Sequence, residues 1–175
     1  MAGHLAGKNI AVTGAGNGIG RGIALACAAE GAKVVVADHG VTMDGSDPSS
    51  EVADVVVDEI RAAGGTAIAV AGDVSEMAVG QRIVDTAVQN WGTIDGVVCV
   101  AGIVRERMLF NMSEEEFDHV VGVHLKGHFT LYRAASAVMR KQETGGSLVG
   151  FTSGAFVAST AQANYSAAKG GIVSL

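Results

Sequence analysis

The residues with the clearest chemical potential lie near the end of the 175-residue chain, where Lys169 follows Tyr165 by four positions. Side chains four positions apart share one face of an α-helix, so the ammonium group would lie beside the phenol. A nearby cation lowers the pKa of a phenol from its ordinary value of about 10 and makes it a usable proton acceptor. Ser153, upstream in the chain, could hold a substrate oxygen through its hydroxyl. These residue types fit proton exchange with an alcohol or a carbonyl group.

A glycine-rich segment early in the chain could bind phosphate. It reads Thr13-Gly14-Ala15-Gly16-Asn17-Gly18-Ile19-Gly20 and leads into an alanine-rich stretch with helical character. Glycines let backbone amides approach a pyrophosphate, and the N-terminus of the following helix offers free N–H groups and a partial positive charge. The spacing is T-G-x-x-x-G-x-G rather than the common G-x-G-x-x-G. A structural turn would use the same glycines, so the phosphate interpretation needs support from elsewhere in the chain.

Asp38 gives that support, because it ends the second apolar run of the chain. A carboxylate in this place can accept hydrogen bonds from the ribose of adenosine. It would also repel a 2′-phosphate, and neither Asn17 nor His39 is an arginine that could bind one. We therefore expect NAD rather than NADP. The alternative is that Asp38 is only a polar residue at the end of a strand.

Short apolar runs rich in β-formers alternate with segments of helical period, which predicts a parallel sheet with helices on both faces. The fold class expected is α/β, a Rossmann-type doubly wound sheet, in a single domain over residues 1–175. In the helix near 50–63, the apolar stripe is expected to contain Val52, Val55, Val56 and Ile60. The expected strands lie near 8–13, 33–38, 66–71, 95–100 and 146–152, and the expected helices near 18–30, 50–63, 75–91, 113–141 and from 163 onward.

Two connecting features can be read from local patterns. Ser113 is followed three residues later by Glu116, the spacing of a capping box, so this acidic run should begin a helix rather than bind a metal ion. The stretch Gly40 to Ser50, which contains Pro48, is long for a connection between a strand and a helix. We expect it to form a lobed loop beside Asp38.

Composition argues against several other functions. The formal net charge is −6 without a run of lysine or arginine, so nothing indicates binding to nucleic acid or to an anionic membrane. No apolar stretch has the roughly 18 residues of a membrane span, and Met1 to Leu5 lack a signal-peptide pattern. Cys27 and Cys99 lie in apolar runs and are expected to be buried thiols, not metal ligands. These features fit a cytoplasmic protein.

Taken together, these motifs resemble the short-chain dehydrogenase/reductase family along the whole chain. The resemblance implies that the serine holds the substrate oxygen, that the tyrosine exchanges the proton, and that the lysine binds the nicotinamide ribose while lowering the pKa of the tyrosine. It also implies contacts of the 73–74 pair with adenine. The residues that carry it are Thr13 to Gly20, Asp38, Asp73, Val74, Ala101, Gly102, Ser153, Tyr165 and Lys169.

The chain departs from the family pattern at two positions and is ambiguous at a third. Val100 stands where the family usually has asparagine, which removes a side-chain hydrogen bond. His124 stands where a second asparagine is usual. It is either a core histidine, on the same helical stripe as Leu131, or a replacement for asparagine in a proton relay to Lys169. Thr152 could compete with Ser153, whose spacing to the tyrosine is one residue shorter than is common.

A narrower resemblance is carried by three segments and by the long loop after Asp38. The segments 102–107, 123–129 and 162–169 look like the (3R)-hydroxyacyl-CoA dehydrogenase domain of multifunctional β-oxidation enzymes, which is similarly NAD-dependent. This implies hydride transfer between NAD and a secondary alcohol or ketone in fatty acid metabolism, with an acyl-CoA as the small-molecule substrate. An enzyme like 3-oxoacyl-carrier-protein reductase is an alternative, because such enzymes share the Gln-Ala-Asn-Tyr segment. A non-catalytic NAD-binding sensor is another, favoured by the missing asparagine.

The resemblance has two further implications. A homodimer or homotetramer is expected, formed through the helix from 113 and the helix that carries Tyr165. Family members also continue for two more strands and a substrate-covering segment beyond the position of Leu175. Residues 1–175 alone are therefore expected to be unstable or inactive.

Overall fold

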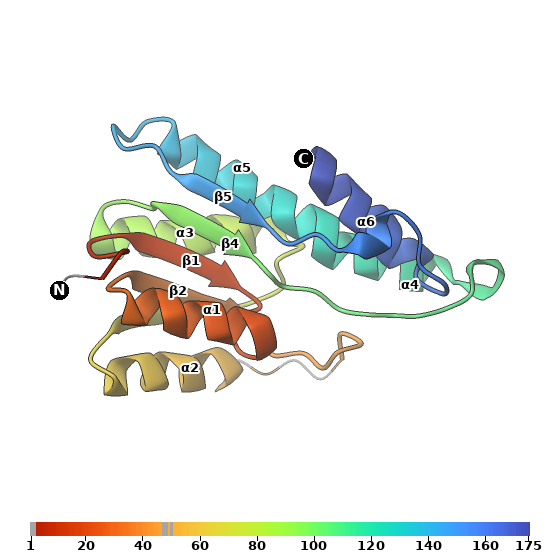
Figure 1. Cartoon of the computed structure of the whole chain (residues 1–175), viewed down its shortest axis with the longest axis horizontal. Helices are drawn as coiled ribbons and strands as arrows, with labels where there is room; N and C mark the ends of the chain where they lie inside the picture. Colours follow the sequence, from red (N-terminus) through yellow and green to blue (C-terminus); the bar gives the residue numbers. More distant parts are fainter. Residues whose placement is uncertain (1–2, 47–48, 50) are drawn as a thin grey trace.

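A computed structural model of the chain describes residues 3–46, 49 and 51–175 (Figure 1). The strands are β1 (Asn9–Thr13), β2 (Lys33–Asp38), β3 (Thr66–Ala71), β4 (Gly96–Cys99) and β5 (Ser147–Gly150). The α-helices are α1 (Gly18–Ala29), α2 (Glu51–Ala62), α3 (Met77–Trp91), α4 (Glu114–Val121), α5 (Gly127–Met139) and α6 (Ala163–Ser174). Two short 3-10 helices, η1 (Leu109–Asn111) and η3 (Gly154–Phe156), and a π-helical segment, η2 (Gly122–Lys126), complete the described elements. Pro48 and Ser50 of the expected lobed loop lie outside the described residues.

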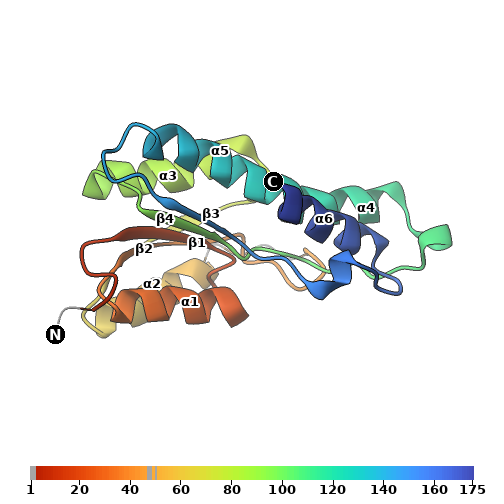
Figure 2. The same ribbon diagram turned by 45° about the horizontal axis from the view of Figure 1, so that its top comes forward.

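The strands form one parallel sheet in the order β3-β2-β1-β4-β5. Successive side chains of a strand point to opposite faces, so each strand supplies two cores. Ala11 and Val35 pack toward α3 and α5, whereas Val12 and Val34 pack toward α1 and α2. Figure 2 shows the sheet edge-on between these two helical layers. The predicted doubly wound α/β fold is confirmed.

The buried stripe of α2 differs from the one expected. Its buried residues are Ala53, Val56, Val57 and Ile60, whereas Val55 is 57% exposed. The positions 53, 56, 57 and 60 follow the i, i+3, i+4, i+7 spacing, which places them on one helical face toward the sheet. The expectation for Val55 was therefore wrong, because an alanine completes the stripe instead of a larger residue.

The predicted helix over 113–141 is present but changes its period in the middle. Ser113 caps it by the expected reciprocal box with Glu116. After α4 the backbone passes through π-helical η2 before α5 begins, and π-helical turns are uncommon and concentrate at functional sites. The side chain of His128, in the first turn of α5, contacts the carbonyl oxygen of His124 in η2 at 2.6 Å. The helix thus contains one locally widened turn at the height of the sheet's carboxyl edge.

The cysteines differ in their surroundings. Cys99 is buried in β4, and this burial raises the pKa of its thiol to about 12. Cys27 in α1 is only half-buried, which corrects the expectation that both are buried. Across the part of the chain that the structure describes, no helix combines the length and apolar character needed to traverse a bilayer.

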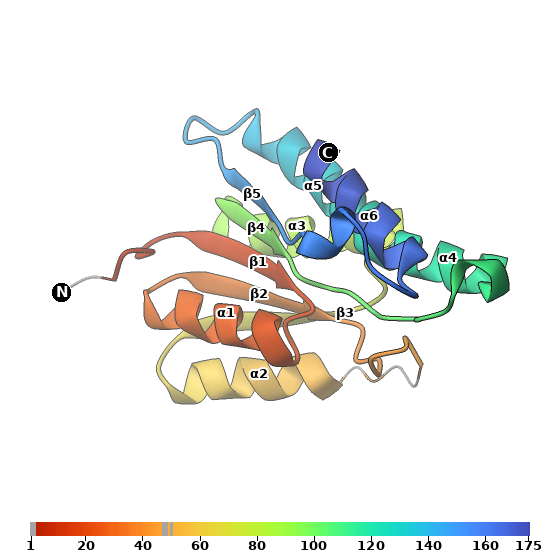
Figure 3. The same cartoon turned by 45° about the vertical axis from the view of Figure 1, so that its right-hand side comes forward.

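The sheet order fixes the place of the site. The chain runs from β1 outward to β2 and β3, and then crosses to β4 on the other side of β1. Connections therefore leave the carboxyl ends of β1 and β4 in opposite directions, which opens a crevice where ligands bind in sheets of this type. Figure 3 shows the loop after β2 and the segment after β4 extending beyond this same edge.

Candidate active site

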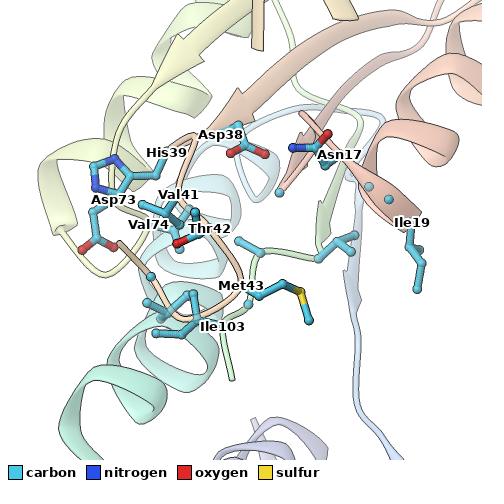
Figure 4. Close-up of a pocket in the computed structure, with 18 of the residues that line it drawn as sticks. Asn17, Ile19, Asp38, His39, Val41, Thr42, Met43, Asp73, Val74 and Ile103 are labelled. Atoms are coloured by element: carbon cyan, nitrogen blue, oxygen red, sulfur yellow. The ribbon is translucent and has the colours of Figure 1, made fainter. Parts of the chain in front are cut away.

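A cavity of about 630 Å³ lies at the carboxyl edge of the sheet (Figure 4). This volume is in the range of pockets that enclose small molecules and cofactors. Its lining includes all the residues expected to hold the cofactor except the Tyr165/Lys169 pair. The lining residues are Gly14, Asn17, Gly18, Ile19, Gly20, Asp38, His39, Val41, Thr42, Met43, Gly45, Gly72, Asp73, Val74, Val100, Ala101, Gly102, Ile103, His119 and Val123.

The glycine loop is shaped by close backbone approaches. Gly14 has φ +62° and lies so near Ala101 that an added β-carbon would stand 2.7 Å from its Cα. A β-carbon on Gly20 would overlap the carbonyl oxygen of Gly14. Only glycine allows these approaches, and they bring the first turn of α1, which begins after Asn17, against the cavity. The resulting row of free amide groups is suited to an anion such as a pyrophosphate.

Asp38 connects two loops of the cavity wall through hydrogen bonds to both of its carboxylate oxygens. Oδ2 accepts a hydrogen bond from the amide of Gly16 at 2.7 Å, and Oδ1 accepts one from the amide of Gly40 at 2.6 Å. Each carboxylate oxygen has two acceptor positions, so Asp38 can accept from ribose hydroxyls as well. The residue therefore joins the glycine loop to the loop after β2 while it faces the cavity.

A part of the cavity wall was not expected from the sequence. Residues 41–45 fold over the cavity as a strap, which is fixed to the segment after β4. The amide of Val104 donates to the carbonyl of Met43 at 2.8 Å, and Nε of Arg105 donates to the carbonyl of Asp44 at 2.9 Å. Gly45 packs against the ring of His119. These are contacts between distant segments, and only the unusual length of the loop signalled them.

The backbone after β4 is held by Thr13 instead of by an asparagine. Thr13 Oγ1 accepts hydrogen bonds from the amides of Val100 and Ala101 at 3.2 and 3.3 Å. Gly102 lies directly against the ring of His124, with no room for a β-carbon. The departure at Val100 thus leaves the path of the backbone beside the cavity intact.

Tyr165 and Lys169 lie together on α6, as their spacing predicts. Lys169 Nζ stands 5.3 Å from the centroid of the Tyr165 ring. The lysine is only 4% exposed, and its ammonium donates to the carbonyl of Phe151 at 2.6 Å. Burial lowers the pKa of Lys169 from 10.5 to about 8, so the amine remains charged at neutral pH. The pair therefore combines a phenol with a desolvated cation.

His124 connects this pair to the cavity. Its ring meets the Tyr165 ring edge-on, with centroids 5.0 Å apart, and its other side touches Gly102. Nε2 lies 2.8 Å from the carbonyl oxygen of Ile103 and donates to it in one tautomer. His124 is 4% exposed and its bonded Nε2 faces the main chain, while its buried Nδ1 has no hydrogen-bond partner among the described residues.

The two hydroxyls that compete for the substrate oxygen differ in their partners. Thr152 Oγ1 donates to the carbonyl of Lys169 at 3.0 Å, so its proton is engaged. Ser153 Oγ only accepts, from the amide of Ala155 at 3.3 Å, and keeps its own proton for another acceptor. This difference favours Ser153 as the group that donates to a substrate oxygen.

The two buried histidines predict acid sensitivity. Burial lowers the pKa of both His124 and His128 from 6.5 to about 4. Between those values the unfolded chain binds protons that the folded chain does not, so the free energy of unfolding should fall as pH falls from 6.5 to 4, by about 1–3 kcal/mol per histidine. Chemical denaturation measures the free energy of unfolding across this pH range. Its decrease toward low pH should be smaller in His124→Asn and in His128→Asn than in the wild type. The exposed His4→Asn is the control, and an equally steep loss in the buried-site variants would contradict the prediction.

The parallel sheet with a cavity at its crossover point defines a Rossmann-type α/β protein. The family described as short chain dehydrogenase matches residues 8–175. The chain belongs to this short-chain dehydrogenase family. The class is thus established for almost the whole sequence.

Similar proteins come from several organisms. The hydroxyacyl-CoA dehydrogenase ChsB1 of Mycobacterium tuberculosis is 47% identical, over 98% of this chain and 55% of that protein. The peroxisomal hydratase-dehydrogenase-epimerase of Saccharomyces cerevisiae is 45% identical, over 100% of this chain and 19% of its own length. The crystal structure of a short chain dehydrogenase from Mycobacterium avium has a TM-score of 0.88 and 50% identity, covering 98% of this chain and 61% of that one. The chain therefore spans between a fifth and about three fifths of these relatives.

Proposed function

We propose that the protein is an NAD-dependent dehydrogenase that oxidises the secondary alcohol of a 3-hydroxyacyl thioester, such as an acyl-CoA, or reduces the matching ketone. The observation that carries the proposal is the pairing of Tyr165 with the buried Lys169 ammonium beyond the Gly102 end of a cofactor-sized cavity. The names of the relatives support the substrate class, since two of them contain hydroxyacyl-CoA dehydrogenase or hydratase-dehydrogenase.

The residues present fit a dinucleotide. The glycine loop can offer amides to a pyrophosphate, and Asp38 can offer acceptors to the adenosine ribose. Asp73 and Val74 also line the cavity, and we propose that they contact the adenine. When bound, NAD supplies the acceptor for a hydride. Lys169 would hold the nicotinamide ribose and keep positive charge beside the phenol. In this arrangement the proton is transferred by side chains of the protein.

In the oxidation direction, the hydroxyl of Ser153 donates to the substrate oxygen and orients the alcohol. Tyr165 accepts the proton from the alcohol oxygen, and NAD, when bound, would supply the acceptor for the hydride of the carbinol carbon. We propose that the positive charge of Lys169, 5.3 Å from the centroid of the tyrosine ring, stabilises the negative charge that develops near the tyrosine oxygen during the transfer. Reduction follows the reverse order. His124 packs against the tyrosine ring and keeps it oriented, so we propose a packing role for it rather than a relay.

A substrate panel tests the proposal. NADH formation should be measured for the full-length protein with 3-hydroxyacyl-CoAs of both configurations, 3-hydroxyacyl-carrier proteins and simple secondary alcohols. Turnover that is highest with a 3-hydroxyacyl-CoA supports the proposal. Preference for the carrier-protein thioester would favour the reductase-like alternative. NAD binding without any turnover would favour the sensor, in which Tyr165 and Lys169 would serve binding alone.

Asp38 predicts the choice of cofactor. A carboxylate beside a 2′-phosphate costs several kcal/mol, so the wild-type protein should bind NAD at least about 100-fold more tightly than NADP. Asp38→Ser should narrow this ratio and also weaken NAD binding, because the hydroxyl cannot accept from Gly16 and Gly40 together. Calorimetric titration of both cofactors measures the ratio, with Asp58→Ser, on the exposed face of α2 and outside the cavity lining, as the matched control. Equal affinities in the wild type would contradict the prediction.

Two further features belong to the proposal. An apolar hollow between α5 and α6, lined in part by Leu125, Phe129 and Leu175, supports a homodimer or homotetramer formed through these helices. Sedimentation of the full-length protein tests this. Both cysteines are free thiols, which supports a reducing compartment such as the cytoplasm. Because some relatives are named peroxisomal, fractionation of cells should compare these two compartments.

A further inference from the structure

Asn164, the residue before the tyrosine, is buried and has no role in the mechanism above. It is 1% exposed, although it lies in the first turn of α6. A buried amide is costly unless its polar atoms are bonded. All of its amide hydrogens and its oxygen are accounted for by neighbours from three segments of the chain.

The hydrogen bonds of Asn164 connect two distant carbonyls to the tyrosine backbone. Nδ2 donates to the carbonyl of Arg105 at 3.0 Å and to the carbonyl of Glu116 at 2.9 Å. Oδ1 accepts from the amide of Tyr165 at 2.8 Å. Only this orientation of the amide satisfies two acceptors and one donor, so the direction of the side chain is determined by its partners.

The surrounding backbone is anchored to the same frame. Ala161 has φ +60°, the one positive value outside glycine among the residues that the structure describes. Such a conformation persists only when neighbours hold it, and here the amide of Arg107 donates to the Ala161 carbonyl at 2.8 Å. Arg107 also pairs with Glu116, the residue whose carbonyl Asn164 contacts. The start of α6 is therefore fixed to α4 and to the segment after β4.

We propose that Asn164 is a positioning residue that sets the place of the Tyr165 phenol relative to the cavity. The amide of Tyr165 has no partner earlier in its own helix, because it lies in the first turn. Asn164 supplies that partner and ties it to the segment that continues from the Gly102 and Ile103 wall of the cavity. The inference rests on the proposed function, since it concerns the same proton acceptor.

The test uses Asn164→Asp and Asn164→Ser in the full-length protein. The aspartate has the same shape and keeps the acceptor for Tyr165, but it turns oxygen toward two carbonyls. The serine is uncharged and too short to reach both of them. Because a misplacement near 1 Å costs about 100-fold in rate, kcat should fall about 100-fold in both variants. The NAD affinity should stay within about threefold of wild type, because none of the hydrogen-bond partners of Asn164 lines the cavity.

A second readout separates positioning from general loosening. With the carbinol hydrogen replaced by deuterium, the isotope effect on kcat should rise in both variants, because the chemical step becomes slower than product release. Gln162→Ala is the matched control. It removes an amide two residues away that bonds only the side chains of Glu106 and Ser159, and it should keep the wild-type kcat and isotope effect.

The outcomes separate the two proposals. A folded Asn164→Ser with wild-type kcat would overturn the positioning role alone, provided that the wild-type protein turns over. Loss of folding in both variants would also overturn it, because Asn164 would then serve global stability. A wild-type protein without turnover on any alcohol would overturn the proposed function, and the inference with it.

Discussion

Replacing Tyr165 with phenylalanine is expected to lower kcat by about 10²- to 10⁴-fold, the usual contribution of a positioned acid or base. The change removes only the hydroxyl. The ring can still pack edge-on against His124 and lie near the Lys169 ammonium. NAD binding should therefore remain nearly intact. Steady-state NADH formation and calorimetric titration of NAD measure the two effects on the same preparation.

Tyr132→Phe is the matched control, because the chain contains only two tyrosines. The Tyr132 ring packs against His128, and burial raises the pKa of its hydroxyl to about 12. The Tyr132→Phe variant should keep the wild-type kcat. A Tyr165→Phe protein with wild-type kcat would remove the basis for assigning the proton transfer to this residue. A loss of NAD affinity as large as the loss of kcat would instead indicate a binding role.

Gly20→Ala is expected to weaken NAD binding by about 10- to 100-fold and to lower the free energy of unfolding by about 1–3 kcal/mol. A β-carbon at this position would overlap the Gly14 carbonyl oxygen. Both partners are backbone, so neither can move aside by changing a rotamer. The glycine loop must then separate from α1, and the amides that face the cavity lose their common direction.

Gly22→Ala is the control, two residues further along the same helix. A β-carbon there meets nothing within 4 Å. Because alanine is the better helix former, this variant should gain about 1 kcal/mol of stability and bind NAD as the wild type does. Urea unfolding and NAD titration of both variants form one experiment. Equal affinities in the two variants would show that the loop does not need its glycine at position 20.

The fold could be predicted from the sequence because its signals are local. Apolar runs and helical periods identified each described strand and α-helix, with α4 and α5 predicted as one helix, and Ser113 with Glu116 identified the start of α4. The short helices η1 and η3 and the widened turn η2 were not predicted. The predictions of burial were wrong where the surroundings of a residue, and not its type, decide whether it is buried. Val55 has an apolar side chain but points outward, since Ala53 completes the stripe that faces the sheet. No composition rule distinguishes those two positions.

The candidate site, too, could be predicted from the sequence only where its signals are local. The motif residues around Gly14 and Asp38 line the cavity, because Gly14 directly follows β1, Asp38 ends β2, and the sheet fixes the ends of both strands. The wall formed by Met43 and Ile103 depends on hydrogen bonds between segments about sixty residues apart, which leave no local pattern. The acceptor for the Lys169 ammonium is the Phe151 carbonyl, and a backbone acceptor cannot be recognised from residue type.

The widened turn η2 (Gly122–Lys126) divides one continuous helix into two phases. A π-helical turn contains about one residue more than an α-helical turn, and each α-helical residue advances about 100° around the axis. Because the widened turn takes up this extra residue, deleting one residue within η2 would restore a uniform helix and keep the buried faces of α4 and α5 in line. The same deletion within α5, ahead of Leu131, would turn the residues that follow it by about 100°, and Leu131, now buried, would leave its neighbours. The turn η2 is thus the part of this helix in which a change of length by one residue disturbs the packing least.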